Sequence, residues 1–493
     1  MICIPIAAKT NAGARNLLAR AESEPADLHE LRLDAIEGRP DVEGLIAASG
    51  RPVLATCRSA EQGGGFAGTR AERLAILQRA VDFGASYIDC EEDVVSAVRR
   101  KSGVVLIASR HDFSAVPDNL RRLADRLAAT PCDWVKFAAA AADAGDNPRI
   151  LEAVKTCKKP AIGIAMGEAG LASRVLGLAY GSKIAFGALS TGLESAPGQP
   201  TARELKDFYR VKDLTADTAV YGLIGDPVAH SLGRMIHNRA FAEAGVDAVY
   251  IPFRCSRARE FLETVPSRLG IRGLSVTMPH KRAALEWADL ATGAADAVGA
   301  ANTLSLRKEG WLADNSDYPA ARDALAAAAL SHGLDPRGKA ALVLGAGGAA
   351  RAVGAALAEL GCATHVAARD GDKARLLAGA SGWTATAWRD RDRGKWAVVA
   401  NATPIGMTPD EDAAPFPAGA WRPGVIAFES VYRPRETRFL REAKAAGAIA
   451  VDGLELFFRQ AALQYESWLG APPPRCYDPA DEYAQALLST RPT

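Results

Sequence analysis

Short apolar runs alternate with helical patterns along roughly the first 210 residues of the chain. Eight runs follow one another at fairly even spacing: 2–7, 28–33, 52–57, 86–91, 104–109, 133–139, 161–166 and 183–189. Amphipathic helical patterns, such as 69–85 and 117–130, lie between them. Because strand and helix alternate eight times, we predict a closed (β/α)8 TIM barrel over 1–213. In that fold the catalytic residues lie at the C-terminal ends of the strands.

The apolar pattern restarts after a polar stretch at 212–219, so we place a domain boundary there. The second half is predicted to be a two-lobed α/β unit. A mixed α/β lobe covers 220–318, and a dinucleotide-binding lobe of Rossmann type covers 319–452. C-terminal helices within 453–493 complete the mixed lobe. The alanine-rich segment 321–333 is expected to form a linking helix.

Composition narrows the classes of protein that fit. Hydrophobic residues make up 48% and charged residues 24% of 493 residues, which is typical of a globular chain. The net charge of +1 offers no basic field for nucleic acid or a membrane surface. Neither a signal-peptide pattern nor a membrane-length apolar run is present. The eight cysteines lack metal-binding spacing, so we expect no metal site, reduced thiols and a cytoplasmic location. The oligomeric state stays open.

Lys136 stands inside an apolar strand, which is an unusual place for a lysine. Strand alternation puts Lys136 on the same face as Trp134 and Ala138, and Val135 and Phe137 on the other. One interpretation is a lysine near the strand end that reaches water. The other is a desolvated amine of lowered pKa that attacks a carbonyl and forms an imine.

Further polar residues follow the predicted strand ends. His111 comes directly after the strand at 104–109 and suits a general base, although a loop histidine can also be a hydrogen-bonded structural residue. Glu30, Arg32 and Asp34 share one strand face, as a polar pocket or a buried ion pair would require. Two arginines are either carboxylate clamps or solvated surface residues: Arg58 and Arg174.

These residues lie in motifs that resemble the type I 3-dehydroquinate dehydratases. The resemblance covers essentially all of residues 1–210 through six ordered motifs: ELRLD, TCRSAEQGG, SRHDF, WVKFA, AGLASRVLG and SAPGQP. It implies that Lys136 forms an imine with the substrate ketone. His111 would then remove the adjacent proton and later protonate the leaving hydroxyl.

The same resemblance implies roles for the surrounding residues. Arg174 would bind the substrate carboxylate, and Ser195 and Gln199 would close over the ring. The substrate hydroxyls and the network around the lysine would be held by Glu30, Arg32 and Arg58. One position departs from the family, because Gln62 stands where a glutamate usually contacts the catalytic histidine. A glutamine orients an imidazole but stabilises its protonated form less, so we expect a reduced rate or a shifted pH optimum.

A G-x-G-x-x-A fingerprint at Gly345, Gly347 and Ala350 lies between an apolar strand and an alanine-rich helix. This context favours a dinucleotide site with the pyrophosphate at the helix N-terminus, which involves Gly345, Gly347, Gly348 and Ala349. Near the end of the next strand, Arg369 and Lys373 suit the 2′-phosphate of NADP, although Asp370 stands between them.

The second half resembles shikimate dehydrogenases over about 220–470, through motifs that include GLIGDPVAHS, SVTMPHK, GAANTL, DNSDY and NATPIGM. The order of the halves is that of the bifunctional enzymes known from plants. The resemblance implies that Lys281 and Asp317 are the catalytic pair, although each taken alone reads as a surface charge. It implies that ring hydroxyls are bound by Asn302, Thr277 and Gln460. It places Ser231 on the carboxylate, and three residues near the carboxylate or nicotinamide: Tyr432, Thr403 and Gly453.

A second departure lies in the usual S-x-S-P motif, which here reads Ser231, Leu232, Gly233 and Arg234. One hydroxyl donor is missing, and the vacated volume has room for the extra hydroxyl of quinate, with Arg234 as a substitute carboxylate contact. Three alternatives stay open: a quinate dehydrogenase, a non-catalytic quinate-sensing regulator, and an aldolase-type barrel fused to a reductase. The leading prediction is a bifunctional shikimate-pathway enzyme that uses NADPH.

Overall fold

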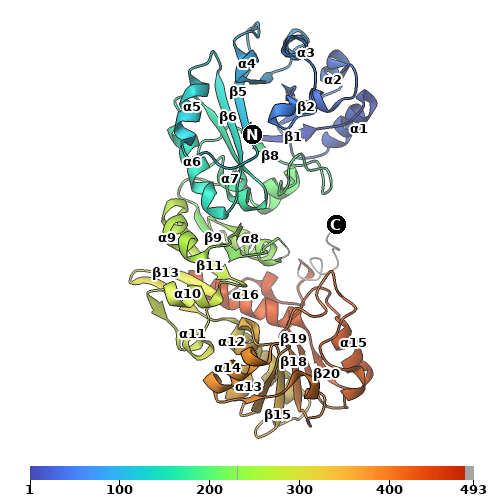
Figure 1. Ribbon diagram of the computed structural model, residues 1–493, viewed down its shortest axis with the longest axis vertical. Helices are drawn as coiled ribbons and strands as arrows, with labels where there is room; N and C mark the ends of the chain where they lie inside the picture. Colours follow the sequence, from blue (N-terminus) through green and yellow to red (C-terminus); the bar gives the residue numbers. More distant parts are fainter. Residues whose placement is uncertain (230, 484–493) are drawn as a thin grey trace.

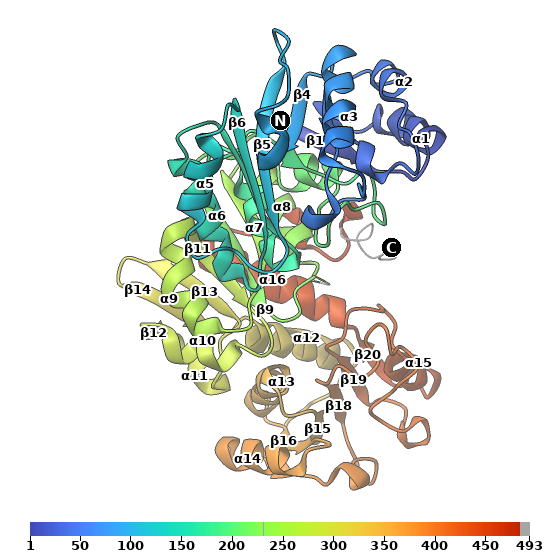
Figure 2. The same ribbon diagram turned by 45° about the horizontal axis from the view of Figure 1, so that its top comes forward.

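The computed structural model describes residues 1–229 and 231–483. Three β-sheets with their helices follow one another along the longest axis of the molecule (Figure 1). The N-terminal barrel lies at one end, the Rossmann lobe at the other, and the mixed lobe between them (Figures 1 and 2). Among these described residues no helix is long and apolar enough to cross a membrane.

The N-terminal sheet has eight parallel strands that lie in chain order, with β8 beside β1. Its strands are β1 (Ile2–Ile6), β2 (Leu28–Arg32), β3 (Val53–Thr56), β4 (Tyr87–Glu91), β5 (Val105–Asp112), β6 (Trp134–Ala140), β7 (Ala161–Met166) and β8 (Ala185–Phe186). The Lys183 N–H donates to the Ala161 carbonyl at 3.0 Å, which connects the segment before β8 to β7. The predicted TIM barrel is confirmed.

Helices cover the outside of this sheet, as the periodicity predicted. They are α1 (Asn11–Ala21), α2 (Val42–Ala47), α3 (Arg70–Asp82), α4 (Glu92–Val95), α5 (Leu120–Ala128), α6 (Asn147–Thr156) and α7 (Leu171–Leu176). A π-helical turn, η5 (Glu204–Phe208), follows β8 in place of an eighth α-helix. Val135 and Phe137 face these helices, whereas Trp134 and Ala138 face the barrel interior, as strand alternation requires.

The middle sheet is mixed, with the order β10-β9-β11-β13-β14-β12. Its strands are β9 (Ala219–Gly225), β10 (Ala248–Arg254), β11 (Ile271–Val276), β12 (Leu290–Ala291), β13 (Thr303–Arg307) and β14 (Gly310–Asp314). Strand β13 runs antiparallel to both of its neighbours. The helices are α8 (Gly233–Glu243), α9 (Ala258–Leu269), α10 (Lys281–Trp287) and α11 (Gly293–Val298).

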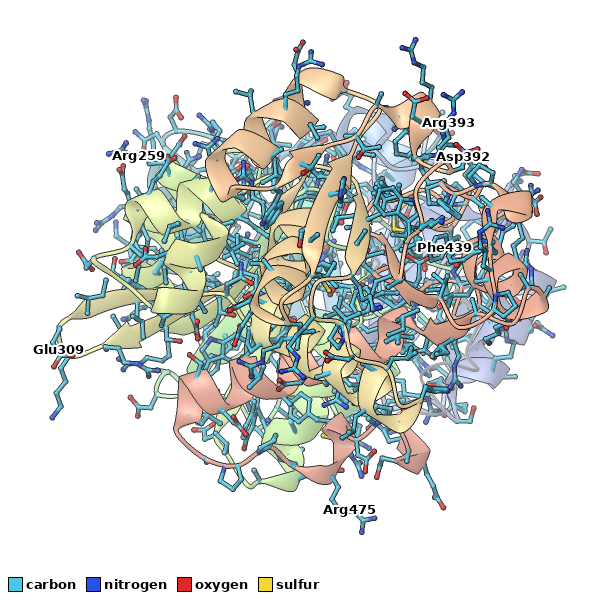
Figure 3. The ribbon with its side chains drawn as sticks, turned by 90° about the horizontal axis from the view of Figure 1, so that it is seen from below. Arg259, Glu309, Asp392, Arg393, Phe439 and Arg475 are labelled. Carbon is cyan, nitrogen blue, oxygen red and sulfur yellow. The ribbon has the colours of Figure 1, made fainter. Side chains whose placement is uncertain are left out.

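The third sheet is fully parallel, with the order β17-β16-β15-β18-β19-β20, which is the doubly wound Rossmann order. Its strands are β15 (Ala340–Leu344), β16 (Ala363–Ala367), β17 (Thr384–Ala385), β18 (Val398–Asn401), β19 (Ile426–Glu429) and β20 (Ile449–Val451). Its helices are α13 (Gly348–Glu359), α14 (Gly371–Ser381) and α15 (Arg438–Ala445). Figure 3 shows Phe439 within this lobe and Arg393 at its periphery.

Two long helices join the lobes of the second half. Helix α12 (Asp317–Ser331) covers residues 321–331 of the predicted linking helix, and the predicted lobe boundary at 318/319 falls inside it. Helix α16 (Gly453–Leu469) returns to the middle lobe, where the Trp468 indole donates to the Leu304 carbonyl at 3.1 Å. The predicted C-terminal segment 453–493 includes this helix, and its residues 484–493 lie outside the described part.

Two candidate active sites

Lys136 lies in the barrel interior, where β6 brings it beside two carboxylates. Its Nζ is 2.8 Å from Asp89 Oδ2 and 3.8 Å from Glu30 Oε1. The Phe186 ring lies 4.4 Å from the same nitrogen. Only 4% of Lys136 is exposed, so the interpretation of a strand-end lysine reaching water is wrong. The amine is instead enclosed, with two carboxylates and an aromatic ring as its neighbours.

Asp89 is the centre of the charge network around this lysine. Its carboxylate also accepts hydrogen bonds from the Arg58 guanidinium, at 2.8 Å, and from the Ser109 hydroxyl. Burial alone would raise its pKa, but the positive charges of Arg58 and Lys136 hold the pKa of Asp89 well below its usual range. Asp89 therefore stays ionised and fixes two cations at the strand ends.

His111 is held one strand away from Lys136, near the end of β5. Strand register pairs Ser109 with Lys136 and His111 with Ala138, so the imidazole lies two residues farther toward the rim. Burial and the charges of Arg58 and Lys136 lower the pKa of His111 well below its usual value. Its Nδ1 is buried without a hydrogen-bond partner among the described residues. A neutral imidazole with a free nitrogen can accept a proton.

Glu30 and Arg32 have different partners although they share a face of β2. Glu30 accepts a hydrogen bond from the Thr56 hydroxyl at 2.7 Å and also faces Lys136. Arg32 donates to both oxygens of Asp34, at 3.0 and 2.7 Å. The Asp34 carboxylate in turn accepts from the Gly65 N–H at 3.0 Å. The ion-pair interpretation is thus right for Arg32 and Asp34, and Glu30 belongs to the lysine pocket.

Two buried donors at the C-terminal end of β7 have no acceptor among the described residues. Arg174 of α7 is 5% exposed, and its Nε is unpaired. Burial lowers the pKa of its guanidinium to about 10. Gln199 accepts from the Ser195 N–H and hydroxyl, both at 2.9 Å, while its own Nε2 is buried and unpaired. These donors suit an anionic, oxygen-rich ligand.

The second site lies where the middle lobe meets the Rossmann lobe. Lys281, the first residue of α10, forms an ion pair with Asp317, the first residue of α12. A Cβ added to Gly348 would lie 2.9 Å from Lys281 Cδ, so the lysine stem passes over the start of α13. The glycine fingerprint and the lysine–aspartate pair are therefore neighbours.

The fingerprint forms a tight strand-to-helix turn. Gly345 has φ +117°, and a Cβ there would lie 2.7 Å from the Ala402 carbonyl oxygen, so a larger residue does not fit. Helix α13 begins after Gly347 without a side-chain cap, so its first N–H groups have no side-chain acceptor there and are available to a phosphate. Thr403 packs on Gly345, and its hydroxyl donates to Asn401 Oδ1 at 2.7 Å.

The charged residues after β16 favour a phosphorylated ribose. Arg369 is exposed, and no ion pair engages it within the described chain. Asp370 caps α14 by accepting from the Lys373 N–H at 3.2 Å, and its carboxylate lies 3.4 Å from Lys373 Nζ. The acidic residue thus caps the helix N-terminus and pairs with Lys373, which leaves Arg369 as the cation without an ion pair in the described part of the chain.

The two halves of the chain match different family models. The model of the type I 3-dehydroquinase family matches residues 2–215, and that of the shikimate dehydrogenase substrate binding domain matches 223–304. The bifunctional 3-dehydroquinate dehydratase/shikimate dehydrogenase of Arabidopsis thaliana is 35% identical over 501 residues, which cover 96% of this chain and 83% of that protein. The chain belongs to this bifunctional family.

The dehydrogenase half has separate relatives of its own. The NADP(+) shikimate dehydrogenase of Anaeromyxobacter sp. (strain K) is 40% identical over 272 residues, covering 53% of this chain and 94% of that protein. The solved shikimate dehydrogenase of Aquifex aeolicus has a TM-score of 0.50 at 28% identity and covers 55% of this chain and 99% of that one. These relatives are named for shikimate, so the quinate and regulator alternatives are not favoured.

Gln62 and Gly233, the two departures from the family, have defined surroundings. Gln62 Oε1 accepts from the backbone N–H of His111 at 2.9 Å. It therefore fixes the main chain of His111, whereas a contact with the imidazole ring had been expected. A Cβ on Gly233 would lie 3.1 Å from the Tyr250 hydroxyl and 3.2 Å from Ser231 Oγ. Part of the volume expected to be vacant is therefore occupied by these two hydroxyls.

Two residues that were expected to face the substrate have partners within the chain. Arg234 pairs with Glu204 of the barrel at 3.5 Å, so its guanidinium already has a carboxylate partner. Gln460 donates to the Phe457 carbonyl of its own helix at 2.9 Å. One turn later the buried Gln464 accepts from the Ser275 hydroxyl at 2.7 Å, a contact that the sequence did not indicate.

The remaining predicted residues line the same region. Asn302 Oδ1 accepts from the Ser316 N–H at 2.8 Å, next to Asp317, and its amide donates to the Ser316 hydroxyl at 2.9 Å. Thr277 follows β11, and its N–H donates to the Ile224 carbonyl. Burial raises the pKa of Tyr432, and the neighbouring Ser231 hydroxyl opposes this rise. Gly453 starts α16, and its Cα lies so close to the Val431 carbonyl that a Cβ would be 2.2 Å from the oxygen.

Asp89 and Glu429 are buried acids that contact predicted site residues or their loops and that no motif indicated. Asp89 stands in the run SYIDCE, where an acid between apolar strand residues was the available signal. Glu429 ends β19 and accepts from Asn401 Nδ2 at 2.9 Å, the Val431 N–H at 2.9 Å and the Thr437 hydroxyl at 2.8 Å. It thereby ties the loop that contains Thr403 to the loop that precedes α15.

Proposed function

We propose that the chain catalyses two consecutive reactions of the shikimate pathway. The barrel dehydrates 3-dehydroquinate to 3-dehydroshikimate, and the second half reduces 3-dehydroshikimate to shikimate with NADPH. The observation that carries the proposal is the presence, in one chain of the bifunctional family, of an enclosed strand lysine beside a neutral histidine and of a separate lysine–aspartate pair at a dinucleotide fold.

In the dehydratase site, Lys136 attacks the ketone, water leaves, and an imine forms. The imine withdraws electrons from the adjacent carbon, so His111 can remove its proton through the unpaired Nδ1. The imidazolium then protonates the departing hydroxyl, which leaves as water. Hydrolysis of the imine releases the product and restores Lys136. Asp89 supports the sequence, because its charge balances the site while the lysine changes from ammonium to imine.

Substrate recognition in the barrel follows from the unpaired donors. Arg174 binds the carboxylate of the substrate, because its buried guanidinium has no counter-ion among the described residues. Gln199 offers its free amide to a ring hydroxyl, with Ser195 beside it. The other polar groups around the ring are supplied by Glu30, Arg32 and Arg58.

In the dehydrogenase site, NADPH supplies the hydride when it is bound. Lys281 donates a proton to the ketone oxygen as negative charge develops there, and Asp317 holds the ammonium in place. Thr277, Asn302 and Gln460 contact ring hydroxyls, and Ser231 and Tyr432 face the carboxylate. The cofactor would be held by the turn at Gly345, Gly347, Gly348 and Ala349, by Thr403 and Gly453 near the nicotinamide, and by Arg369 and Lys373 at the 2′-phosphate.

We assign the domains as 1–213 for the dehydratase, 220–318 with 453–493 for the substrate lobe, and 319–452 for the NADP lobe. The sheet boundaries support this division. We place the enzyme in the cytoplasm, because all eight cysteines are free thiols, seven of them buried, as is usual in a reducing compartment. Its small-molecule partners are the pathway intermediates.

The test uses the full chain and identifies products by NMR. We expect 3-dehydroquinate with NADPH to give shikimate, and NADH to be a poorer reductant. Lys136→Met should stop dehydration but leave the reduction of supplied 3-dehydroshikimate intact, and Lys281→Met should do the reverse. Borohydride with 3-dehydroquinate should attach the reduced imine to the wild-type chain and not to the Lys136 variant. Quinate as the product, or trapping at another lysine, would contradict the proposal.

A further inference from the structure

A loop of the barrel holds one peptide group of the dehydrogenase. Asp143 follows β6, the strand of Lys136, and precedes the 3-10 helix η3 (Ala144–Asp146). Its Oδ2 accepts from the Ser256 N–H at 2.7 Å and from the Ser256 hydroxyl at 2.8 Å. Ser256 lies two residues after β10 of the dehydrogenase. The contact therefore crosses the interface between the two enzymes of the chain.

The carbonyl side of the same peptide group is also occupied. The Cys255 carbonyl accepts from His280 Nε2 at 2.6 Å, and both residues are buried. Because a carbonyl oxygen only accepts, Nε2 of His280 carries a proton. The peptide between Cys255 and Ser256 thus connects a carboxylate on its N–H side to an imidazole on its carbonyl side. A charged acceptor on the N–H polarises the peptide and strengthens the bond at its oxygen.

His280 connects this peptide to the catalytic lysine. It is the residue directly before α10, its N–H donates to the Thr277 carbonyl, and its own carbonyl accepts from the Ala284 N–H, both at 2.9 Å. Lys281 follows as the first residue of the helix and pairs with Asp317. The orientation of His280 therefore sets where α10 begins and from where the Lys281 side chain extends.

We infer that Asp143 is a positioning residue for the dehydrogenase reaction: through the Cys255–Ser256 peptide and His280, the dehydratase barrel holds Lys281 in register with Asp317. The inference rests on the proposed role of Lys281 as proton donor. It means that the barrel completes the dehydrogenase site, and that a dehydrogenase half without the barrel loses a contact to its own catalytic helix.

The experiment assays the full chain with 3-dehydroshikimate and NADPH, so that the dehydratase step is bypassed. Asp143→Ala should lower kcat about tenfold, while KM for 3-dehydroshikimate changes less than about twofold. The reason is that Asp143 acts on the position of Lys281, which is needed in the transition state. Asp143→Asn retains one acceptor oxygen without the charge and should recover part of the loss. His280→Ala should lower kcat similarly. The kcat of the double variant D143A/H280A should be no lower than that of the more impaired single variant, because the two residues act in series.

Two controls separate this role from general damage. Asp146→Ala disturbs the same loop, but the Asp146 carboxylate contacts Ala142 and Arg149 within the barrel. Tyr180→Phe removes another hydrogen bond between the halves, from the Tyr180 hydroxyl to the Arg268 carbonyl at 3.2 Å. Both variants should keep kcat within about twofold of wild type. Equal losses in D143A and either control would overturn the inference.

The outcomes distinguish this inference from the proposed function. A wild-type chain that does not reduce 3-dehydroshikimate, or a Lys281→Met variant with the wild-type rate, would refute the function itself. An active wild type and an inactive Lys281 variant, together with D143A at the wild-type kcat, would refute only the inference. If D143A does not fold, D143N and His280→Gln decide. The inference requires that kcat of D143N is lower than that of wild type and that kcat of H280Q is higher than that of H280A. It is overturned if either result is absent.

Discussion

Replacing Arg174 by methionine should stabilise the free enzyme while it weakens substrate binding. The guanidinium is enclosed in the barrel, and no carboxylate lies within ion-pair distance of it among the described residues. Burial lowers its pKa from the usual arginine value to about 10, although the group remains charged at neutral pH. A buried charge without a partner opposes folding, so a side chain of similar length without the charge should relieve that cost.

The magnitude follows from the pKa of Arg174. The lowering of this pKa to about 10, at about 1.4 kcal/mol per pH unit, corresponds to about 3 kcal/mol of stability lost to the buried charge at pH 7. This cost applies below the lowered pKa of about 10 and disappears as the pH rises above it toward the usual arginine pKa, because the unfolded chain binds the proton more tightly. Loss of a charged hydrogen bond to the substrate should raise KM for 3-dehydroquinate by about 10- to 100-fold.

Arg73 provides the matched control, because it is also a buried arginine of the barrel but has carboxylate partners. Its Nη1 lies 2.5 Å from Glu91 Oε2. Arg73→Met should therefore destabilise the barrel by about 3–5 kcal/mol. Both variants are compared with wild type by hydrogen exchange of the barrel strand amides, which reports the free energy of barrel unfolding, and by dehydratase kinetics. An Arg174→Met variant that is less stable than wild type and keeps its KM would refute the reasoning.

Four other changes test the remaining features. Gln62→Glu places a carboxylate near His111, so the pKa of the imidazole should rise and the acid limb of the dehydratase pH–rate profile should move to higher pH; an unchanged profile would show that Gln62 acts on the main chain alone. Arg369→Ala should raise KM for NADPH about tenfold or more and leave KM for NADH nearly unchanged, and equal effects on both would exclude a 2′-phosphate contact. Gly233→Ser should tighten shikimate binding about tenfold if its hydroxyl reaches the carboxylate, and a rise in KM would show that the nearby Tyr250 hydroxyl excludes the side chain. Burial raises the pKa of Glu429 from 4.5 to about 7, so wild type should lose up to about 3 kcal/mol of stability as the pH rises from 4.5 through 7. The free energy of unfolding of Glu429→Gln, measured by urea denaturation, should lack this pH dependence, and the same dependence in both proteins would assign it to other groups.

The barrel and its lysine were accessible from the sequence because they depend on local periodicity. The alternation around Lys136 predicts which neighbours face the helices, and β6 (Trp134–Ala140) agrees with the predicted run 133–139 within one residue. The last strand is the exception, because the predicted run 183–189 pairs with β1 over only Ala185 and Phe186. That pairing is a property of the closed sheet, and no local pattern encodes it.

The partners of buried charges were less accessible, because they come from other strands. A strand lysine implies carboxylates nearby, but the composition of β2 and β4 allows Glu30, Asp89 or Glu91 to take that role. Strand order and register decide that Asp89 bonds to Lys136, whereas Glu91 pairs with Arg73. Gln460 and Gln464 likewise lie one helical turn apart, and only the packing of α16 on the middle sheet selects Gln464 for the buried network.

The two lysines of the proposed mechanism differ in how far their surroundings can be predicted from motifs and from the fold. The surroundings of Lys136 are built within one sheet, so knowledge of the barrel fold nearly suffices to assemble them. Lys281 depends on contacts from three parts of the chain: Asp317 begins the helix that joins the lobes, Gly348 belongs to the Rossmann turn, and Asp143 reaches the preceding residue from the barrel. Motifs identified the lysine, the aspartate and the glycine separately. The contact with Asp143 has no motif, because it exists only once the two enzymes are packed together in one molecule.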